Sequence, residues 1–172
     1  MSSASIRRSW WKPPFPMRGT GNCGFTPAAG RDPGRFTEAQ ADIYAQALSE
    51  LRAGEKRSHW MWFIFPQVAG LGSSTTSRHY AIKDAAEARA YLAHPILGPR
   101  LLECTRAVLD LQDRSARQVF GPVDELKFRS SMTLFAALEG ADPVFRQALE
   151  KYFAGQQDQR TLELLGQASV SD

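Results

Sequence analysis

A run of six apolar residues, Trp60–Phe65, constrains this chain more than any other stretch. It holds two tryptophans, two phenylalanines, an isoleucine and a methionine, and Pro66 follows it. A run this short does not cross a bilayer, which takes about 20 apolar residues, so it must be buried in the protein or line a pocket. Because every position is apolar, periodicity does not decide between a strand and a buried helical turn.

The composition indicates one folded domain preceded by a basic segment. The chain has 172 residues, of which 43% are hydrophobic, enough for one core. Residues 1–34 hold five Lys or Arg against one acid, whereas residues 35–172 hold 16 bases against 17 acids. The basic charge therefore belongs to the N-terminal segment, and a nucleic-acid-binding face is not indicated for the domain itself.

Three segments follow from this pattern. Residues 1–34 contain five of the ten prolines and five of the thirteen glycines without hydrophobic periodicity, which predicts a disordered basic leader. The leader could be a tail that contacts nucleic acid, an organelle transit peptide, although it lacks the amphipathic pattern of one, or an extension without a role. We expect a helical domain over residues 35–168 and a frayed end over residues 169–172.

The remaining composition favours a cytoplasmic protein. We find no secretory signal and no segment that would span a membrane. Two cysteines, Cys23 and Cys104, do not make a disulfide framework. The cysteines and the three histidines lack the spacing of metal ligands, so we predict no metal, and no cofactor is indicated.

Helix signals predict a mainly α domain of six or seven helices with at most one short strand. Helix starts are indicated by Thr37 with Gln40, Asp84 with Glu87, Ser115, and Asp142 before Pro143. Gly54, Gly121 and Gly155 are the expected stops. Residues 70–77 are predicted to be a loop.

The helix expected from Val123 to Glu139 carries polar residues within its apolar face. With Asp124 at zero and about 100° per residue, Lys127 falls at about 300° and Ser131 at about 340°, among apolar side chains. Ser130, at about 240°, flanks them. Polar groups buried in this way are costly unless they satisfy one another or a ligand, which points to a site. Alternatively Asp124 is a helix cap, Lys127 reaches water and Ser131 bonds to a carbonyl.

The aromatic run could supply the other half of a pocket. Trp60 and Trp62 could stack on a planar ligand, with His59 and Gln67 as hydrogen-bonding groups. The alternative is that the run only fills the core. The loop that follows it combines glycines and hydroxyls, as in anion-binding turns, at Gly70, Gly72 and Ser73.

Several segments resemble the bacterial DUF1810 family in both composition and order. They are residues 58–67 (Ser-His-Trp-Met-Trp-Phe-Ile-Phe-Pro-Gln), Gly70-Leu-Gly72, Tyr80, residues 87–95, residues 97–101 and residues 124–135. The resemblance runs from about residue 35 to residue 166. It implies a mainly α-helical single domain and no established activity. Some members are labelled calpastatin, a label that this compact, apolar sequence does not support.

Two functions remain open at this point. The first is binding of a small, planar, phosphorylated or ribosylated metabolite, with hydrolytic or glycosidic turnover. Its candidate catalytic residues are His59, Asp124, Lys127 and Ser131. Its candidate ligand-binding residues are Trp60, Trp62, Gln67, Gly70, Gly72, Ser73 and Ser130. The alternative is a non-enzymatic protein-interaction module that uses an aromatic face or the leader.

Overall fold

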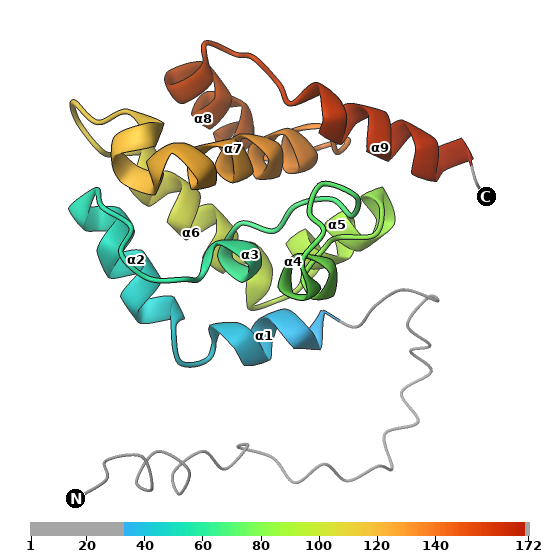
Figure 1. Cartoon of the computed structure of the whole chain (residues 1–172), viewed down its shortest axis with the longest axis horizontal. Coiled ribbons are helices and arrows are strands. Elements are labelled where there is room, and N and C mark those ends of the chain that lie inside the picture. The colour runs from blue at the N-terminus through green and yellow to red at the C-terminus, as the bar shows by residue number, and fades with distance from the viewer. Residues whose placement is uncertain (1–32, 171–172) are drawn as a thin grey trace, which may run out of the picture.

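The structure, a computed structural model, describes residues 33–170 (Figure 1). These residues form nine helices and no strand. The helices are α1 (Gly34–Gln40), α2 (Tyr44–Ala53), α3 (Met61–Ile64), α4 (Thr75–His79), α5 (Ala85–Ala93), α6 (Leu97–Leu109), α7 (Ala116–Ala136), α8 (Pro143–Phe153) and α9 (Gln159–Val170). Our predictions for residues 1–32 and for the last two residues lie outside the described part.

Helices α6 and α7 organise the packing. Helix α7 packs against α8 and α9, and α6 packs against α2, α5 and α8. The short helix α3 contacts α1, α6 and α7, so the apolar run lies between the first and second halves of the domain (Figure 1). No helix in the described part of the chain is long and apolar enough to cross a membrane.

Three of the predicted helix starts are confirmed. The Asp84 side chain accepts the Glu87 N–H at 2.8 Å, and the Asp142 side chain accepts the Val144 N–H at 2.9 Å. Ser115 and Gln118 cap α7 reciprocally. Each of these signals works within one helical turn, which is why sequence alone locates it.

The predicted count of six or seven helices was wrong, because single turns also formed in segments expected to be loop or ambiguous. The first predicted helix is broken into α1 and α2, and the start at Thr37 was wrong. Helix α1 begins one turn earlier, Thr37 Oγ1 donates to Gly34 O at 2.9 Å, and Gln40 is buried among other helices. Helix α4 occupies part of the predicted 70–77 loop, since Ser74 caps it through the Ser77 N–H at 3.1 Å.

The apolar run is a helical turn and most of it is core. Trp60 and Phe65 are both 0% exposed, while Trp62 remains half-buried at the edge. Phe65 packs edge-on against Phe128 of α7, with ring centroids 5.0 Å apart. A single parallel bridge, between Val68 and Ile82, is the sole β pairing among the described residues. The run therefore fixes α3 against α7 and leaves one indole near the surface.

Candidate functional site

Asp124 of α7 lies between two lysines. Its Oδ2 atom is 2.8 Å from Lys56 Nζ and its Oδ1 atom is 2.9 Å from Lys127 Nζ. The three side chains are 8% (Lys56), 18% (Asp124) and 23% (Lys127) exposed, so water screens them only in part. Two cations on one carboxylate leave this partly buried group with a net charge of +1.

Each lysine also lies over a tryptophan ring. Lys127 Nζ is 4.5 Å from the centroid of Trp62, and Lys56 Nζ is 5.1 Å from that of Trp60. Such cation–π contacts hold an ammonium group in a defined place. We call the row Trp60, Lys56, Asp124, Lys127 and Trp62 the charge ladder.

A break in α7 positions Asp124. Gly121 has φ 87° and ψ 168°, outside the helical region, and Pro122 starts the helical segment that follows. Pro fits the first helical position, and a carboxylate in the first turn is favoured by the helix dipole. On the other side of the ladder, the Lys56 N–H donates to Val119 O at 2.7 Å and Lys56 Nζ donates to Ser58 O at 2.6 Å. The backbone thus fixes Lys56 beside the start of this segment.

A second carboxylate, Glu50 of α2, holds the chain that leads into α3. Its Oε2 atom accepts the N–H groups of Arg57 at 2.9 Å and Ser58 at 3.1 Å, and the Trp60 indole N–H at 2.8 Å. Its Oε1 atom accepts from Ser58 Oγ at 2.6 Å and from Gln46 Nε2 at 3.1 Å. Glu50 is 9% exposed and is therefore a nearly buried, fully hydrogen-bonded anion.

Both carboxylates remain charged well into the acidic range. Burial by itself raises the pKa of Glu50, but hydrogen bonds from Ser58, Arg57, Trp60 and Gln46 outweigh it and lower this pKa to about 2. For Asp124, burial also acts to raise the pKa, and the hydrogen bonds and charges of Lys56 and Lys127 bring it below its ordinary value. A carboxylate held ionised in this way serves as an anion or a base, not as a proton donor at neutral pH.

The structure brings together Trp62, Asp124 and Lys127, three of the predicted site residues. Trp60 joins them as a buried end of the ladder, with no exposed ring face. Lys56 and Glu50 were missed by the sequence reasoning, which took residues 55–57 as a charged lead-in.

His59, Gln67 and the predicted loop residues form no hydrogen bond or ion pair with the ladder's charged atoms in the described part of the chain. His59 is exposed and its side chain forms no hydrogen bond with any described residue. The backbone carbonyl of Gln67 accepts the Ile82 N–H at 2.8 Å. The Gly70, Gly72 and Ser73 positions are exposed, and a Cβ atom at Gly70 would meet Leu164 of α9 at 3.0 Å. No hydrogen bond or ion pair among the described residues joins this loop to Asp124 or the lysines.

The two neighbouring serines of α7 differ in their hydrogen bonding. Ser130 Oγ donates to Leu126 O at 3.0 Å, one turn earlier. Ser131 is 0% exposed, and its Oγ is the one buried side-chain N or O atom in the described part of the chain that lacks a hydrogen-bond partner.

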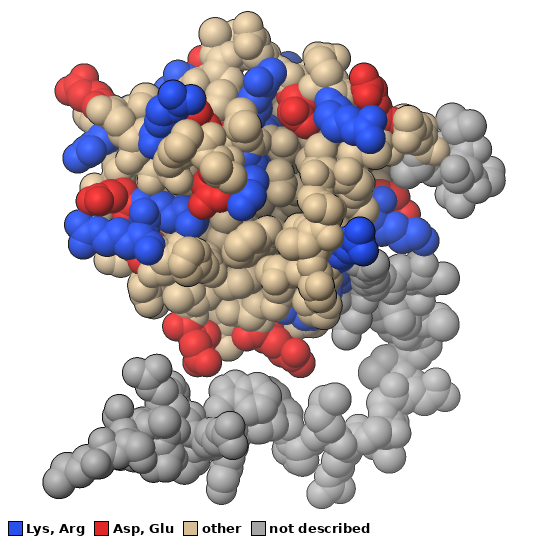
Figure 2. Space-filling model, viewed as in Figure 1, with Lys and Arg blue, Asp and Glu red and all other residues tan. Residues whose placement is uncertain are grey.

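Two apolar side chains project into solvent next to the ladder. Val123 is 65% exposed and Leu126 is 57% exposed, and they flank Asp124 and Lys127 in α7. On the face shown in Figure 2, basic and acidic side chains are interspersed.

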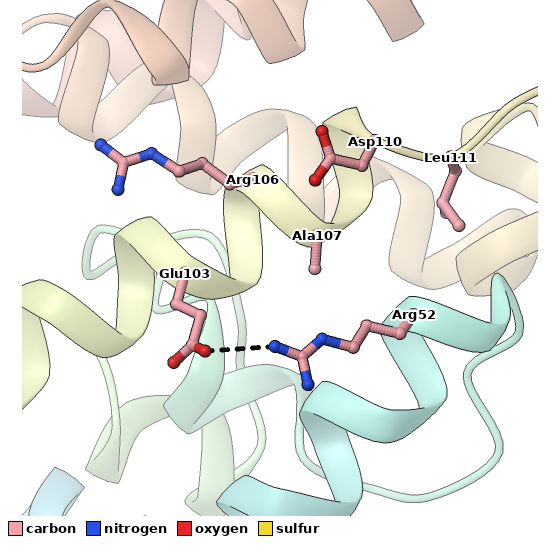
Figure 3. Close-up of a pocket in the computed structure, with 6 residues that line it drawn as sticks. All are labelled: Arg52, Glu103, Arg106, Ala107, Asp110 and Leu111. Carbon is pink, nitrogen blue, oxygen red and sulfur yellow. Dashed lines mark hydrogen bonds and ion pairs between the residues drawn. The ribbon is translucent and has the colours of Figure 1, made fainter.

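Two surface cavities lie elsewhere on the domain. The first, of about 450 Å³, opens between α2 and α6 and is lined by Arg52, Glu103, Arg106, Ala107, Asp110 and Leu111 (Figure 3). The ion pair between Arg52 and Glu103, at 3.3 Å, crosses it, and both side chains are about half exposed or more. The second, of about 320 Å³, lies where α5 and α6 meet the turn between α7 and α8. Among the described residues, no group of three or more His, Cys, Asp or Glu side chains could hold a metal ion.

Comparison with known proteins identifies relatives without an assigned activity. No curated protein matches the chain. A crystal structure of the conserved hypothetical protein Rv1873 from Mycobacterium tuberculosis is 52% identical in sequence, with a TM-score of 0.77 over 78% of this chain and 96% of that one. The sequence profile described as "protein of unknown function (DUF1810)" matches residues 31–165, so this chain belongs to the DUF1810 family.

Proposed function

We propose that the charge ladder binds a small anionic metabolite that also carries a planar group, such as a nucleotide. The observation that carries this proposal is the pair of partly buried lysines that share one carboxylate. An anionic oxygen of the ligand binds Lys127, and its planar group lies against Trp62.

Charge balance supports an anion as the ligand. Lys56, Asp124 and Lys127 together hold one ammonium group more than they hold carboxylates, and Glu50, the carboxylate bonded to the Trp60 indole, already accepts five hydrogen bonds. Lys127 is the more exposed of the two lysines. Its ammonium group bonds to Asp124, whereas that of Lys56 bonds to Asp124 and also donates to Ser58 O. Lys127 is therefore the group that turns toward an incoming phosphate or carboxylate, while Lys56 remains on Asp124.

Trp62 supplies the aromatic surface for the planar group of the ligand. Its ring is half-buried and the Lys127 ammonium group lies 4.5 Å from the ring centroid, which supports this face as the place for the planar group. Trp60 is enclosed and cannot stack on a ligand. A planar ligand group replaces the ammonium group of Lys127 on the Trp62 face when the lysine moves to the anion.

Hydrolytic or glycosidic turnover is the finer part of this proposal. Because hydrogen bonds hold the pKa of Asp124 low, Asp124 could act only as a charged base or as an electrostatic group. His59 would have to supply the proton, and it is exposed without an orienting partner. Binding is therefore the function that the geometry supports best.

A thermal-shift titration with AMP, ADP-ribose, adenosine and inorganic phosphate tests the proposal. AMP and ADP-ribose should raise the melting temperature more than adenosine or phosphate alone, since a ligand at 100 times its Kd stabilises the fold by about 2.7 kcal/mol. Lys127→Met and Trp62→Leu should each reduce the shift, whereas Lys83→Met, at an exposed lysine of the Lys83–Asp84 turn, should not. The proposal is refuted if no probe shifts the wild type, or if Lys127→Met shifts as the wild type does.

A second candidate function, protein–protein interaction, is favoured by the exposed pair Val123 and Leu126. Exposed apolar side chains that lie together are typical of contact surfaces. Sedimentation velocity of the wild type and the Val123→Ser/Leu126→Ser double variant tests whether this surface joins two copies of the chain. Association that the double variant loses supports the interaction, and a monomer in both samples argues against self-association.

A further inference from the structure

The hydroxyl of Ser131 differs from three other buried hydroxyls on the helices of this domain. Thr105 Oγ1 donates to Leu101 O at 2.8 Å, Thr133 Oγ1 donates to Arg129 O at 2.8 Å, and Ser130 does the same to Leu126 O. Each uses the carbonyl one turn earlier, a local solution open to any helical serine or threonine. Ser131, 0% exposed, does not, and it has no other partner in the described part of the chain.

The position of Ser131 on α7 ties it to the charge ladder. It follows Lys127 by four residues, so the two lie on one face of the helix, one turn apart. The neighbours of Ser131 on that face show its direction: Lys127 contacts Trp62 of α3, and Phe135 packs on Tyr91 of α5 at 5.6 Å. Ser131 lies between Lys127 and Phe135 on this face of α7, one helical turn from each.

We infer that Ser131 is the inner hydrogen-bonding group of the ladder site, and that the Lys127–Trp62 contact closes over it in the absence of ligand. This inference rests on the proposed function. When Lys127 turns to an anionic oxygen, the ligand gains access to the face that it covered, and the Ser131 hydroxyl donates to a second oxygen of the same phosphate or carboxylate. A buried hydroxyl without a partner destabilises the ligand-free protein, and its hydrogen bond to an oxyanion stabilises the complex.

Ser131→Ala should have opposite effects on stability and on affinity for the ligand. Without ligand, removing an unsatisfied hydroxyl should raise the melting temperature by about 2–4 °C. With AMP as the probe, isothermal titration calorimetry should show affinity weakened about tenfold or more, because a hydrogen bond to a charged group is lost.

Ser130→Ala is the matched control, since it removes the hydroxyl of an adjacent buried serine that is already bonded to Leu126 O. This variant should not melt at a higher temperature than the wild type. Its affinity for AMP should stay within about twofold of the wild-type value, a smaller change than the loss of one hydrogen bond to the ligand would cause.

The outcomes separate this inference from the proposed function. If the wild type and Ser131→Ala bind AMP equally while Lys127→Met does not, the ladder site stands and the role of Ser131 is refuted. If Ser131→Ala lowers the melting temperature without ligand, its hydroxyl is satisfied inside the fold and the inference fails whatever the affinity. If the wild type does not bind AMP, the proposed function fails and the inference with it.

Discussion

Replacing Glu50 by glutamine should remove a large and pH-dependent part of the stability of this domain. The carboxylate accepts five hydrogen bonds from α2 and from the segment that leads into α3. A glutamine oxygen in the Oε2 position keeps the three N–H donors from Arg57, Ser58 and Trp60. The substitution therefore removes mainly the negative charge that strengthens these bonds.

The size of the effect follows from the pKa. The pKa of Glu50 falls from an ordinary 4.5 to about 2. A difference of this size corresponds to about 3 kcal/mol of folding free energy at pH 7. Because the folded-state pKa is depressed, this contribution is complete above pH 4.5 and is lost as the pH falls toward 2. At pH 2.5 the wild type and Glu50→Gln should differ by less than about 1 kcal/mol.

Urea denaturation, followed by tryptophan fluorescence at pH 7 and pH 2.5, measures the prediction. With an m-value near 2 kcal/mol/M, the midpoint of Glu50→Gln should lie about 1.5 M below the wild type at pH 7 and converge with it at pH 2.5. Glu55→Gln is the control, because the Glu55–Arg57 pair is exposed and the same chemical change should alter stability by less than about 0.5 kcal/mol. Equal midpoints at pH 7, or a gap that persists at pH 2.5, would show that Glu50 does not anchor the segment before α3 through its charge.

Two further predictions concern buried positions. Cys104 is 0% exposed, and burial, together with the nearby charge of Glu103, raises its pKa to about 12. In a Cys23→Ser background, a disulfide reagent at pH 8 should therefore label Cys104 only as fast as the protein unfolds. Rapid labelling of the folded protein would contradict this prediction. At Gly98 a Cβ atom would lie 2.0 Å from Leu92 O, so Gly98→Ala should lower the stability measured in thermal melts by about 3 kcal/mol or more. Gly166→Ala is the control, because a Cβ atom there meets nothing within 4 Å and the substitution should not lower stability. Equal melting temperatures of the two variants would refute the packing of α5 on α6.

The features that sequence predicted correctly depend on residues within one or two helical turns. The caps at Asp84, Ser115 and Asp142 are such cases. The polar face of α7 is another, because the 3.6-residue period alone places Asp124 and Lys127 together, and the structure shows them 2.9 Å apart. The helical period therefore predicts which residues lie together within one helix.

The features that sequence did not predict depend on contacts between distant segments. In the sequence Glu50 is one polar residue of a predicted helix, and it becomes a buried anchor only because residues 57–60 fold back onto α2. Lys56 reads as part of a charged lead-in, and it becomes a ladder residue because its backbone bonds to Val119, over 60 residues away. Gln40 likewise fails as a cap because Phe63 O and Tyr91 hold its side chain elsewhere.

Asp124→Asn distinguishes a carboxylate that organises the ladder from one that contacts the ligand. The substitution leaves Lys56, 8% exposed, and Lys127 without a counter-charge, so stability at pH 7 should fall by about 2 kcal/mol. The net charge of the site rises from +1 to +2 at the same time, so AMP should bind about tenfold more tightly. Asp110→Asn, at the exposed C-terminal end of α6, should change neither quantity. Weaker AMP binding by Asp124→Asn would mean that the carboxylate itself accepts from the ligand or acts on it, and the ladder would then be a reaction centre and not a cationic binding site.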